Sequence, residues 1–113
     1  MNANVIARKL ESLQKKGSIT SVDVANVLQI RPETVSRWNQ GNAFPQPEAE
    51  RILLDLECAV DLLADLYEPD ETRVWLFAKQ KLLNGEIPAE LIRLGRTDEV
   101  IKIIWQLLEG VYV

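Results

Sequence analysis

Apolar residues recur at helical spacing along almost the whole chain. In residues 4–16 they fall on one side of a helix, at Val5, Ile6, Leu10 and Leu13. No stretch of useful length alternates strictly between apolar and polar residues, and no Asn-Gly or Asp-Gly pair joins two β-branched runs. The sequence therefore predicts an all-α protein.

Turn and capping residues divide the first half of this pattern into three short helices. We expect them over residues 4–16, 20–28 and 32–40. Gly17 suits the end of the first helix, and Thr20 suits the N-cap of the second. A proline opens the third helix and a glycine follows it, which is the usual asymmetry of helix ends.

A long helix is expected from Glu48 to about Tyr67, after a loop with two prolines. Its apolar residues cover more than one narrow stripe, so it needs neighbours on two sides. We place it between the N-terminal helices and those that follow. Leu56 and Leu63 lie on the same face, which we expect to be buried.

Shorter helices are predicted in the remainder of the chain. Pro69 and Pro88 each suit the first turn of one, and a last helix runs from Thr97 or Asp98 to Gly110, which ends it. We expect buried positions for Trp75, Trp105 and Cys58. The domain prediction is a helix-turn-helix lobe with the long connecting helix (1–67) and a small C-terminal helical lobe (68–113).

Composition and charge narrow the classes of function. The 113 residues include no histidine and one cysteine, which excludes His-based catalytic triads and His or Cys₄ zinc sites. We expect no enzyme, no metal, no cofactor, no membrane segment, no secretory signal and a cytoplasmic location. Residues 1–50 carry six basic and five acidic residues, and residues 51–113 carry seven and twelve. The acidic second half suits a protein partner rather than phosphates.

Residues 21–40 have the spacing of a helix-turn-helix. The small residue Ala25 stands where two short helices cross closely, and Gln29 occupies the turn position where glycine is commonest. Apolar residues stand where the crossing must be buried: Val24, Leu28, Ile30, Val35 and Trp38. The stretch 19–45 resembles the helix-turn-helix of the Xre/Cro type.

The outer face of the third helix carries side chains suited to base edges. Glu33, Ser36, Arg37 and Gln40 follow the spacing i, i+3, i+4, i+7. The candidate DNA-binding residues are Thr20, Ser21, Glu33, Thr34, Ser36, Arg37 and Gln40. Because one copy has few cations to meet phosphates, we expect a homodimer on promoter DNA.

The second half has a recognisable order of motifs: Trp75-Leu76-Phe77, Leu82-Leu83-Asn84-Gly85, Pro88-Ala89-Glu90-Leu91-Ile92, Gly95-Arg96 and Gly110-Val111-Tyr112-Val113. This order resembles the C-terminal toxin-binding domain of Xre/MbcA/ParS-type antitoxins. The resemblance implies a type II antitoxin that silences a RES-domain toxin, encoded by an adjacent gene, which consumes NAD or transfers its ADP-ribose. It also implies repression of the shared promoter and a higher-order toxin–antitoxin complex.

The candidate toxin-binding residues are Arg93, Arg96, Gly110, Val111, Tyr112 and Val113. Two interpretations of the apolar tail stay open: it folds back onto the core of its own chain, or it lies in the active-site cleft of the toxin. Arg93 and Arg96 are either partner contacts or cations at a helix C-terminus.

Two rival functions also stay open. One is a plain helix-turn-helix transcription regulator whose C-terminal lobe only dimerises or senses a ligand. The other is an interaction module that has lost DNA binding. A neighbouring gene for a RES-domain protein favours the antitoxin.

Overall fold

A computed structural model describes the backbone of residues 3–111 and the side chains of residues 5–110. This part of the chain forms seven α-helices and one 3₁₀ turn, η1: α1 (Ala3–Gly17), α2 (Ser21–Leu28), α3 (Pro32–Gln40), α4 (Pro47–Leu63), α5 (Pro69–Phe77), η1 (Lys81–Leu83), α6 (Pro88–Arg93) and α7 (Thr97–Val111). The all-α prediction is confirmed. None of the helices in residues 3–111 has the length and apolar character that a membrane crossing requires.

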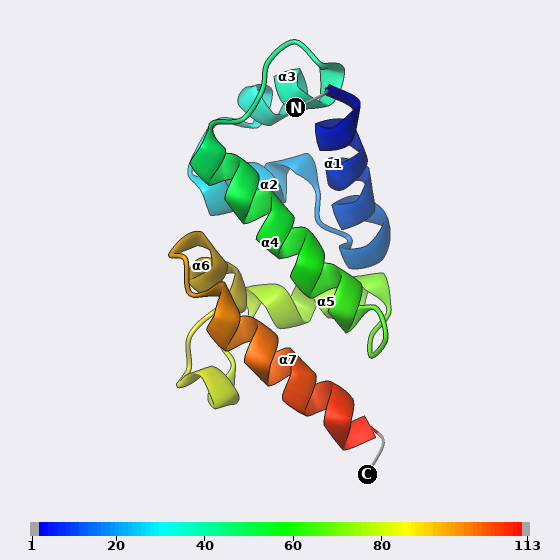
Figure 1. Cartoon of the computed structure of the whole chain (residues 1–113), viewed down its shortest axis with the longest axis vertical. Helices are drawn as coiled ribbons and strands as arrows, with labels where there is room; N and C mark the ends of the chain where they lie inside the picture. Colours follow the sequence, from blue (N-terminus) through cyan, green and yellow to red (C-terminus); the bar gives the residue numbers. More distant parts are fainter. Residues whose placement is uncertain (1–2, 112–113) are drawn as a thin grey trace.

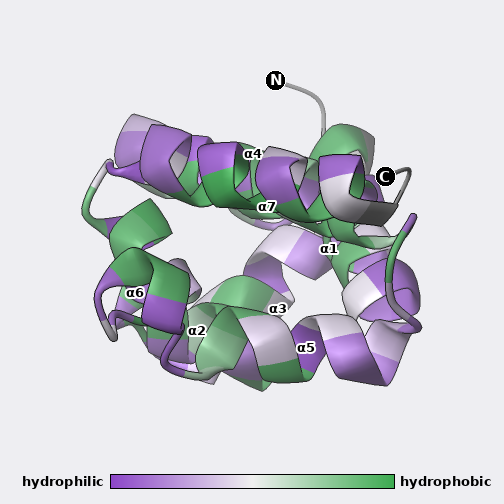
Figure 2. Ribbon diagram, turned by 90° about the horizontal axis from the view of Figure 1, so that it is seen from below, coloured by the Kyte–Doolittle hydropathy of each residue, from purple (hydrophilic) through white to green (hydrophobic). Residues whose placement is uncertain are grey.

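The helices are arranged in two layers. Figure 2 shows α4 and α7 in one layer, above a second layer that contains α2, α5 and α6. The molecule measures 47 × 23 × 21 Å, and α3 lies near one end of its long axis while α7 ends at the other (Figure 1). Helices far apart in sequence therefore share one layer.

Helix α4 lies at the centre of the molecule. It contacts α1 and α2 on the N-terminal side and α6 and α7 on the C-terminal side, so the prediction of neighbours on two sides is confirmed. Leu56 and Leu63 are fully buried, also as predicted. The helix ends at Leu63 rather than Tyr67, because the chain turns over residues 64–67 to bring Pro69 into the first turn of α5.

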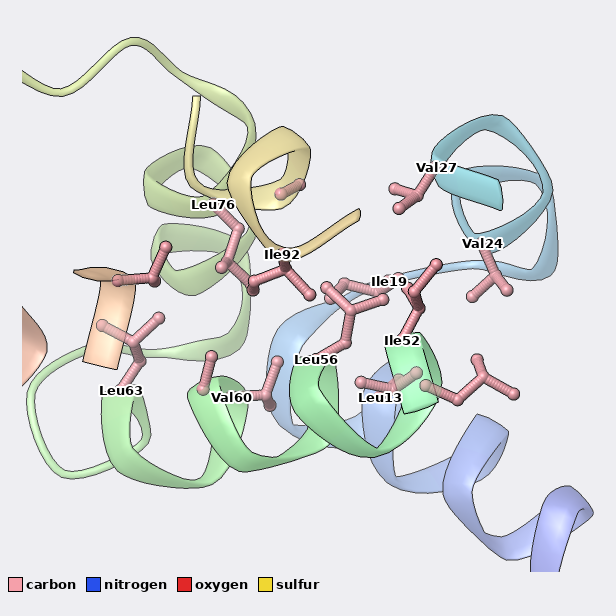
Figure 3. Packing of buried hydrophobic residues seen from close by; sticks show 14 of the residues in the cluster. Leu13, Ile19, Val24, Val27, Ile52, Leu56, Val60, Leu63, Leu76 and Ile92 are labelled. Atoms are coloured by element: carbon pink, nitrogen blue, oxygen red, sulfur yellow. The ribbon is translucent and has the colours of Figure 1, made fainter. Parts of the chain in front are cut away.

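One continuous core joins the two layers. Figure 3 shows Leu56, Val60 and Leu63 of α4 among buried residues from the other layer, including Leu76 and Ile92. The core draws on residues from Ile6 to Leu108, so both halves of the sequence contribute to it.

Two of the predicted core residues are not in the core. Trp75 is buried, as expected, but Trp105 is 51% exposed and Cys58 is exposed. Both predictions were wrong for the same reason: these residues lie on parts of α7 and α4 that face away from the second layer. An apolar residue type alone does not show which side of a helix is covered.

The predicted end of the last helix was also wrong. Helix α7 continues through Gly110 to Val111, and no described atom outside the adjacent residues and backbone of this helix lies within 4 Å of the place where a Cβ on Gly110 would stand. No other element of the described chain packs closely against Gly110, so nothing forces the backbone to leave the helical conformation at this residue. The presence of a glycine alone does not end the helix. Tyr112 and Val113 lie outside the described residues.

Candidate functional site

The connection between α2 and α3 has the geometry that the sequence predicts. Gln29 adopts the left-handed conformation (φ 59°), and the N–H of Ile30 donates to the carbonyl of Ala25 at 3.0 Å. Ala25 and Val35 are fully buried, so the two helices approach closely. A glutamine is tolerated at this turn at a modest cost in strain.

The start of α2 is held by a reciprocal pair of hydrogen bonds. The hydroxyl of Thr20 accepts from the N–H of Asp23 (3.1 Å), and the carboxylate of Asp23 accepts from the N–H of Thr20 (2.8 Å). This is a capping box, which satisfies backbone donors that the first turn leaves free. Thr20 is therefore an exposed N-cap, as predicted.

Helix α5 reaches this cap from the other half of the sequence. Arg73 donates to the carboxylate of Asp23 and to the carbonyl of Ser18, and its guanidinium lies 5.4 Å from the ring centre of Phe77. Burial alone raises the pKa of Asp23, but hydrogen bonds from Arg73 and Thr20 outweigh it and hold that pKa below its ordinary value. A second contact joins Ser18 to Asp70. The turn between α1 and α2 is thus fastened to α5.

The outer face of α3 is free to meet a ligand. Glu33, Ser36, Arg37 and Gln40 are all exposed, as the helical spacing predicts. Thr34 is half-buried and lines a groove between α3 and α4, so the structure does not place it with these four. The candidates Thr20 and Ser21 stand at the start of α2, where Ser21 is half-buried.

Half of the cations in residues 1–50 are already engaged in ion pairs. Lys9, Lys15 and Lys16 bind Glu57, Glu11 and Asp61 respectively, at 2.9–3.1 Å. Among the described side chains, Arg8, Arg31 and Arg37 make no ion pair. One copy therefore offers few free positive charges to a polyanion.

Of the two candidate arginines in the C-terminal half, Arg96 is occupied within the chain. Its guanidinium binds Glu99 (2.6 Å) and Glu86 (3.0 Å), and hydrogen bonds to these carboxylates raise its pKa. Arg96 thereby ties the start of α7 to the segment after η1. These bonds favour a structural role over a partner contact.

Arg93 lies in a different setting. It is half-buried at the end of α6 and borders a hollow of about 200 Å³ between α2, α5 and α6. Val27, Phe77, Ile87 and Ala89 form the apolar part of its lining. Arg93 makes no ion pair with the described side chains, so its guanidinium is available to a partner.

The structure does not bring the C-terminal candidates together. Gly110 is exposed near the end of α7, while Arg93 and Arg96 precede its first residue. The helix has 15 residues, which separates its two ends by about 21 Å. A single partner that contacts both groups has to follow the length of α7.

Two observations concern metal binding and the reactivity of the single cysteine. Residues 5–110 contain no group of three or more His, Cys, Asp or Glu side chains placed to hold a metal ion. The thiol of Cys58 has a raised pKa, first because of partial burial and then because of the nearby carboxylates of Asp55, Asp61 and Glu57. This thiol therefore remains protonated and weakly nucleophilic at neutral pH.

Two residues of this region were missed from the sequence. Asp23 follows Thr20 by three positions, which is the spacing of a capping box, so a local signal for it was present. Arg73 carries no such signal, because it lies 50 residues from Asp23 in the chain.

Comparison with known proteins places the chain in a family. No family model matches it. Proteins described as mycobacterial cidal antitoxin MbcA, from Mycobacterium bovis and Mycobacterium tuberculosis, are 31% identical over 113 residues, the full length of this chain and of each relative. A probable mycobacterial cidal antitoxin of M. tuberculosis is 33% identical over 109 residues, which is 96% of this chain and 93% of that protein.

A solved structure agrees with these relatives. A chain in the crystal structure of the M. tuberculosis MbcT–MbcA toxin–antitoxin complex matches with a TM-score of 0.82 and 31% identity, over 97% of this chain and 99% of that chain. Sequence and fold thus match along essentially the whole length, and the chain belongs to the MbcA antitoxin family.

Proposed function

We propose that this chain is an antitoxin that binds and neutralises a cognate toxin encoded beside it. One observation carries the proposal: the chain matches, over nearly its full length, an MbcA chain known from a toxin–antitoxin complex. The motif order from Trp75 to Val113 supports a RES-domain toxin that consumes NAD or transfers ADP-ribose. The chain acts in the cytoplasm, contributes no catalytic group and needs no cofactor or metal.

The test is co-expression with the protein of the neighbouring gene. Induction of that protein alone is expected to stop growth and deplete cellular NAD, and co-expression of this chain is expected to restore both. The purified proteins are expected to form a stable complex in which NAD consumption is inhibited at a stoichiometric ratio. Growth arrest that persists despite equal soluble expression of both proteins contradicts the proposal.

The C-terminal end of α7 and the residues after it are the proposed contact with the toxin's cleft. Deletion of residues 111–113 is expected to leave helix content unchanged and to abolish or sharply weaken neutralisation. Arg93→Ala is expected to weaken the complex, with Lys79→Ala as a control at an exposed cation outside these contacts. A truncated chain that still inhibits NAD consumption at a stoichiometric ratio contradicts the role of the tail.

The second part of the proposal is repression of the shared promoter through α2 and α3 as a helix-turn-helix. The exposed face of α3 and the free arginines beside it support this part. If Arg37 contacts a base edge, Arg37→Ala is expected to cost about 1–3 kcal/mol in operator binding and to relax preference at one base pair. Thermal stability is expected to stay nearly the same, because the side chain is exposed. Equal operator affinity of the two proteins at matched salt contradicts this assignment.

A further inference from the structure

Two side chains of α5 contact the turn between α1 and α2. Asp70 and Arg73 are three residues apart, which places them on the same face of α5. The hydroxyl of Ser18 donates to Asp70 at 2.6 Å. Arg73 donates to the carbonyl of Ser18 and to the carboxylate of Asp23. We call these four residues, Ser18, Asp23, Asp70 and Arg73, the α5–α2 bridge.

The bridge joins two helices whose facing sides are incompletely packed. Figure 2 shows α2 and α5 in the same layer. The hollow of about 200 Å³ that Arg93 borders also lies between Val27 of α2 and Phe77 of α5. Helix α5 itself packs against α1 and α6. The position of α2 relative to α5 therefore depends strongly on the polar contacts of the bridge.

Apolar contacts keep the turn between α1 and α2 in place without the bridge. Ile19 is buried, and a Cβ on Gly17 would lie 3.1 Å from the side chain of Val60, so the end of α1 packs closely against α4. We therefore expect the chain to stay folded when the bridge is removed. The direction of α2 beyond the turn is what changes.

An arginine suits the bridge better than a lysine. The guanidinium of Arg73 lies 5.4 Å from the ring centre of Phe77, which favours one orientation of its plane. In this orientation its Nη1 donates both to the carbonyl of Ser18 and to the carboxylate of Asp23. A lysine has no plane to stack on a ring and no fixed fork of donors. Arg73 thus fixes the position of the Asp23 carboxylate, which caps α2.

A displacement at the start of α2 reaches α3 through the crossing of these two helices. Ala25 of α2 and Val35 of α3 are fully buried, and the N–H of Ile30 donates to the carbonyl of Ala25 at 3.0 Å. Closely packed interiors of this kind transmit small displacements. Since α3 packs chiefly against α1 and α2, the position of α2 determines one of its two supports.

We propose that Arg73, from the half of the chain assigned to toxin binding, is a positioning residue for operator binding by α2 and α3, an inference that rests on the proposed repressor function. Arg73 acts through Asp23: it fixes the first turn of α2, and α2 fixes one side of α3. The helix-turn-helix is therefore expected to need α5 for its full affinity for DNA.

Binding of the full chain to a DNA fragment of its own promoter tests the role of Arg73. Arg73→Met keeps a long apolar side chain, removes the guanidinium and is expected to weaken binding about tenfold. Arg73→Lys, which keeps the charge, is expected to recover part of the loss. Circular dichroism verifies that each variant is folded at the temperature of the measurement.

Arg51→Met is the matched control for this experiment. It also removes a partly exposed arginine with ion pairs, but the contacts of Arg51 join α4 to the end of α6. Its affinity for the promoter fragment is expected to stay within about twofold of the wild type. Equal affinities of Arg73→Met and the wild type at matched salt overturn the proposal.

A double-mutant cycle separates positioning from simple charge compensation. If Arg73 acts through the position of Asp23, Arg73→Met is expected to change promoter affinity by less than about twofold in an Asp23→Asn chain. Wild-type affinity in the double variant overturns the proposal, because it means that Arg73 only compensates the charge of Asp23 near the DNA. Losses that add in full also overturn it, because Arg73 then acts independently of Asp23.

Two spin labels measure the position of α3 in the absence of DNA. One is attached to Cys58, which is exposed on α4, and the other to Asn39→Cys, an exposed position on α3 outside the candidate contacts. Pulsed electron paramagnetic resonance is expected to give one narrow distance distribution with Arg73 present and a shifted or broader one with Arg73→Met. Identical distributions overturn the proposal. Distributions that differ, in a chain that does not bind its promoter, contradict the proposed repressor function and leave the positioning of α3 by Arg73 standing.

Discussion

At the scale of the residue, Thr72 stands out because its buried hydroxyl has no partner. The residue is fully buried in α5, and its Oγ1 makes no hydrogen bond. Thr72→Val keeps the shape and removes the unsatisfied group, so we expect the protein to become more stable by about 1 kcal/mol. The free energy of unfolding in urea measures the change.

The control for this prediction is Thr97→Val, the same substitution where the hydroxyl donates to Asp55 at 2.8 Å. That variant is expected to lose stability. A Thr72→Val protein that is less stable than the wild type contradicts the interpretation of the buried hydroxyl.

Exposure of single residues was the part that the sequence predicted least well. Trp75 and Trp105 both stand among apolar neighbours, yet one is buried and the other is half exposed. Ile104 points into the core, so Trp105 is turned by about 100° towards the edge of its layer. Periodicity locates the apolar side of a helix, but tertiary packing decides how many residues on either side of it are buried.

At the scale of the element, local signals predicted those helix boundaries that capping and turn residues set. Thr20, Gln29, Pro32 and Gly41 act through the backbone of their own segment, and the structure has each in its expected conformation. The end of α4 depends instead on the turn over residues 64–67 that leads into α5. Sequence spacing does not contain that information.

The cap of α2 leads to a prediction on pH dependence. The pKa of Asp23 is held below the ordinary 3.8, so its ionised form stabilises the fold fully above pH 3.8 and less as the pH falls through the lowered value. Asp23→Asn keeps an acceptor for the N–H of Thr20 but loses the charge opposite Arg73. We expect a loss of about 1–2 kcal/mol at neutral pH and a smaller difference near pH 3.

Unfolding in urea at the two pH values measures this difference, and Asp98→Asn is the control at an exposed carboxylate in the first turn of α7. A difference between wild type and Asp23→Asn that grows on acidification is the result that contradicts the prediction.

The centre of α4 gives a prediction on packing. Leu56 is fully buried between the two layers, so Leu56→Ala is expected to lower the free energy of unfolding by about 2–5 kcal/mol. The same substitution at Leu82, which is 60% exposed, is expected to change it by less than about 0.5 kcal/mol. Urea unfolding compares the two variants, and similar small losses in both would mean that the core around α4 is loose.

At the scale of the whole molecule, the all-α class followed from the sequence, whereas the contacts between distant parts did not. The division at residue 67 remains a prediction. The observed core runs through it, since α4 packs against α1, α6 and α7 and α5 packs against α1. The ion pair between Arg73 and Asp23 and the hydrogen bond between Ser18 and Asp70 cross the same boundary.

A core shared in this way predicts that both halves unfold together. Trp38 and Trp75 are buried in different halves, and Trp105 can be replaced by phenylalanine because it is half exposed. In that background, Trp75→Phe leaves a reporter in the first half and Trp38→Phe leaves one in the second. For each variant, we expect the urea midpoint measured by tryptophan fluorescence to coincide with the midpoint of its own circular dichroism signal. If the urea midpoints from fluorescence and from circular dichroism differ in either variant, the two halves unfold independently. The continuous core then contributes little to the coupling between them.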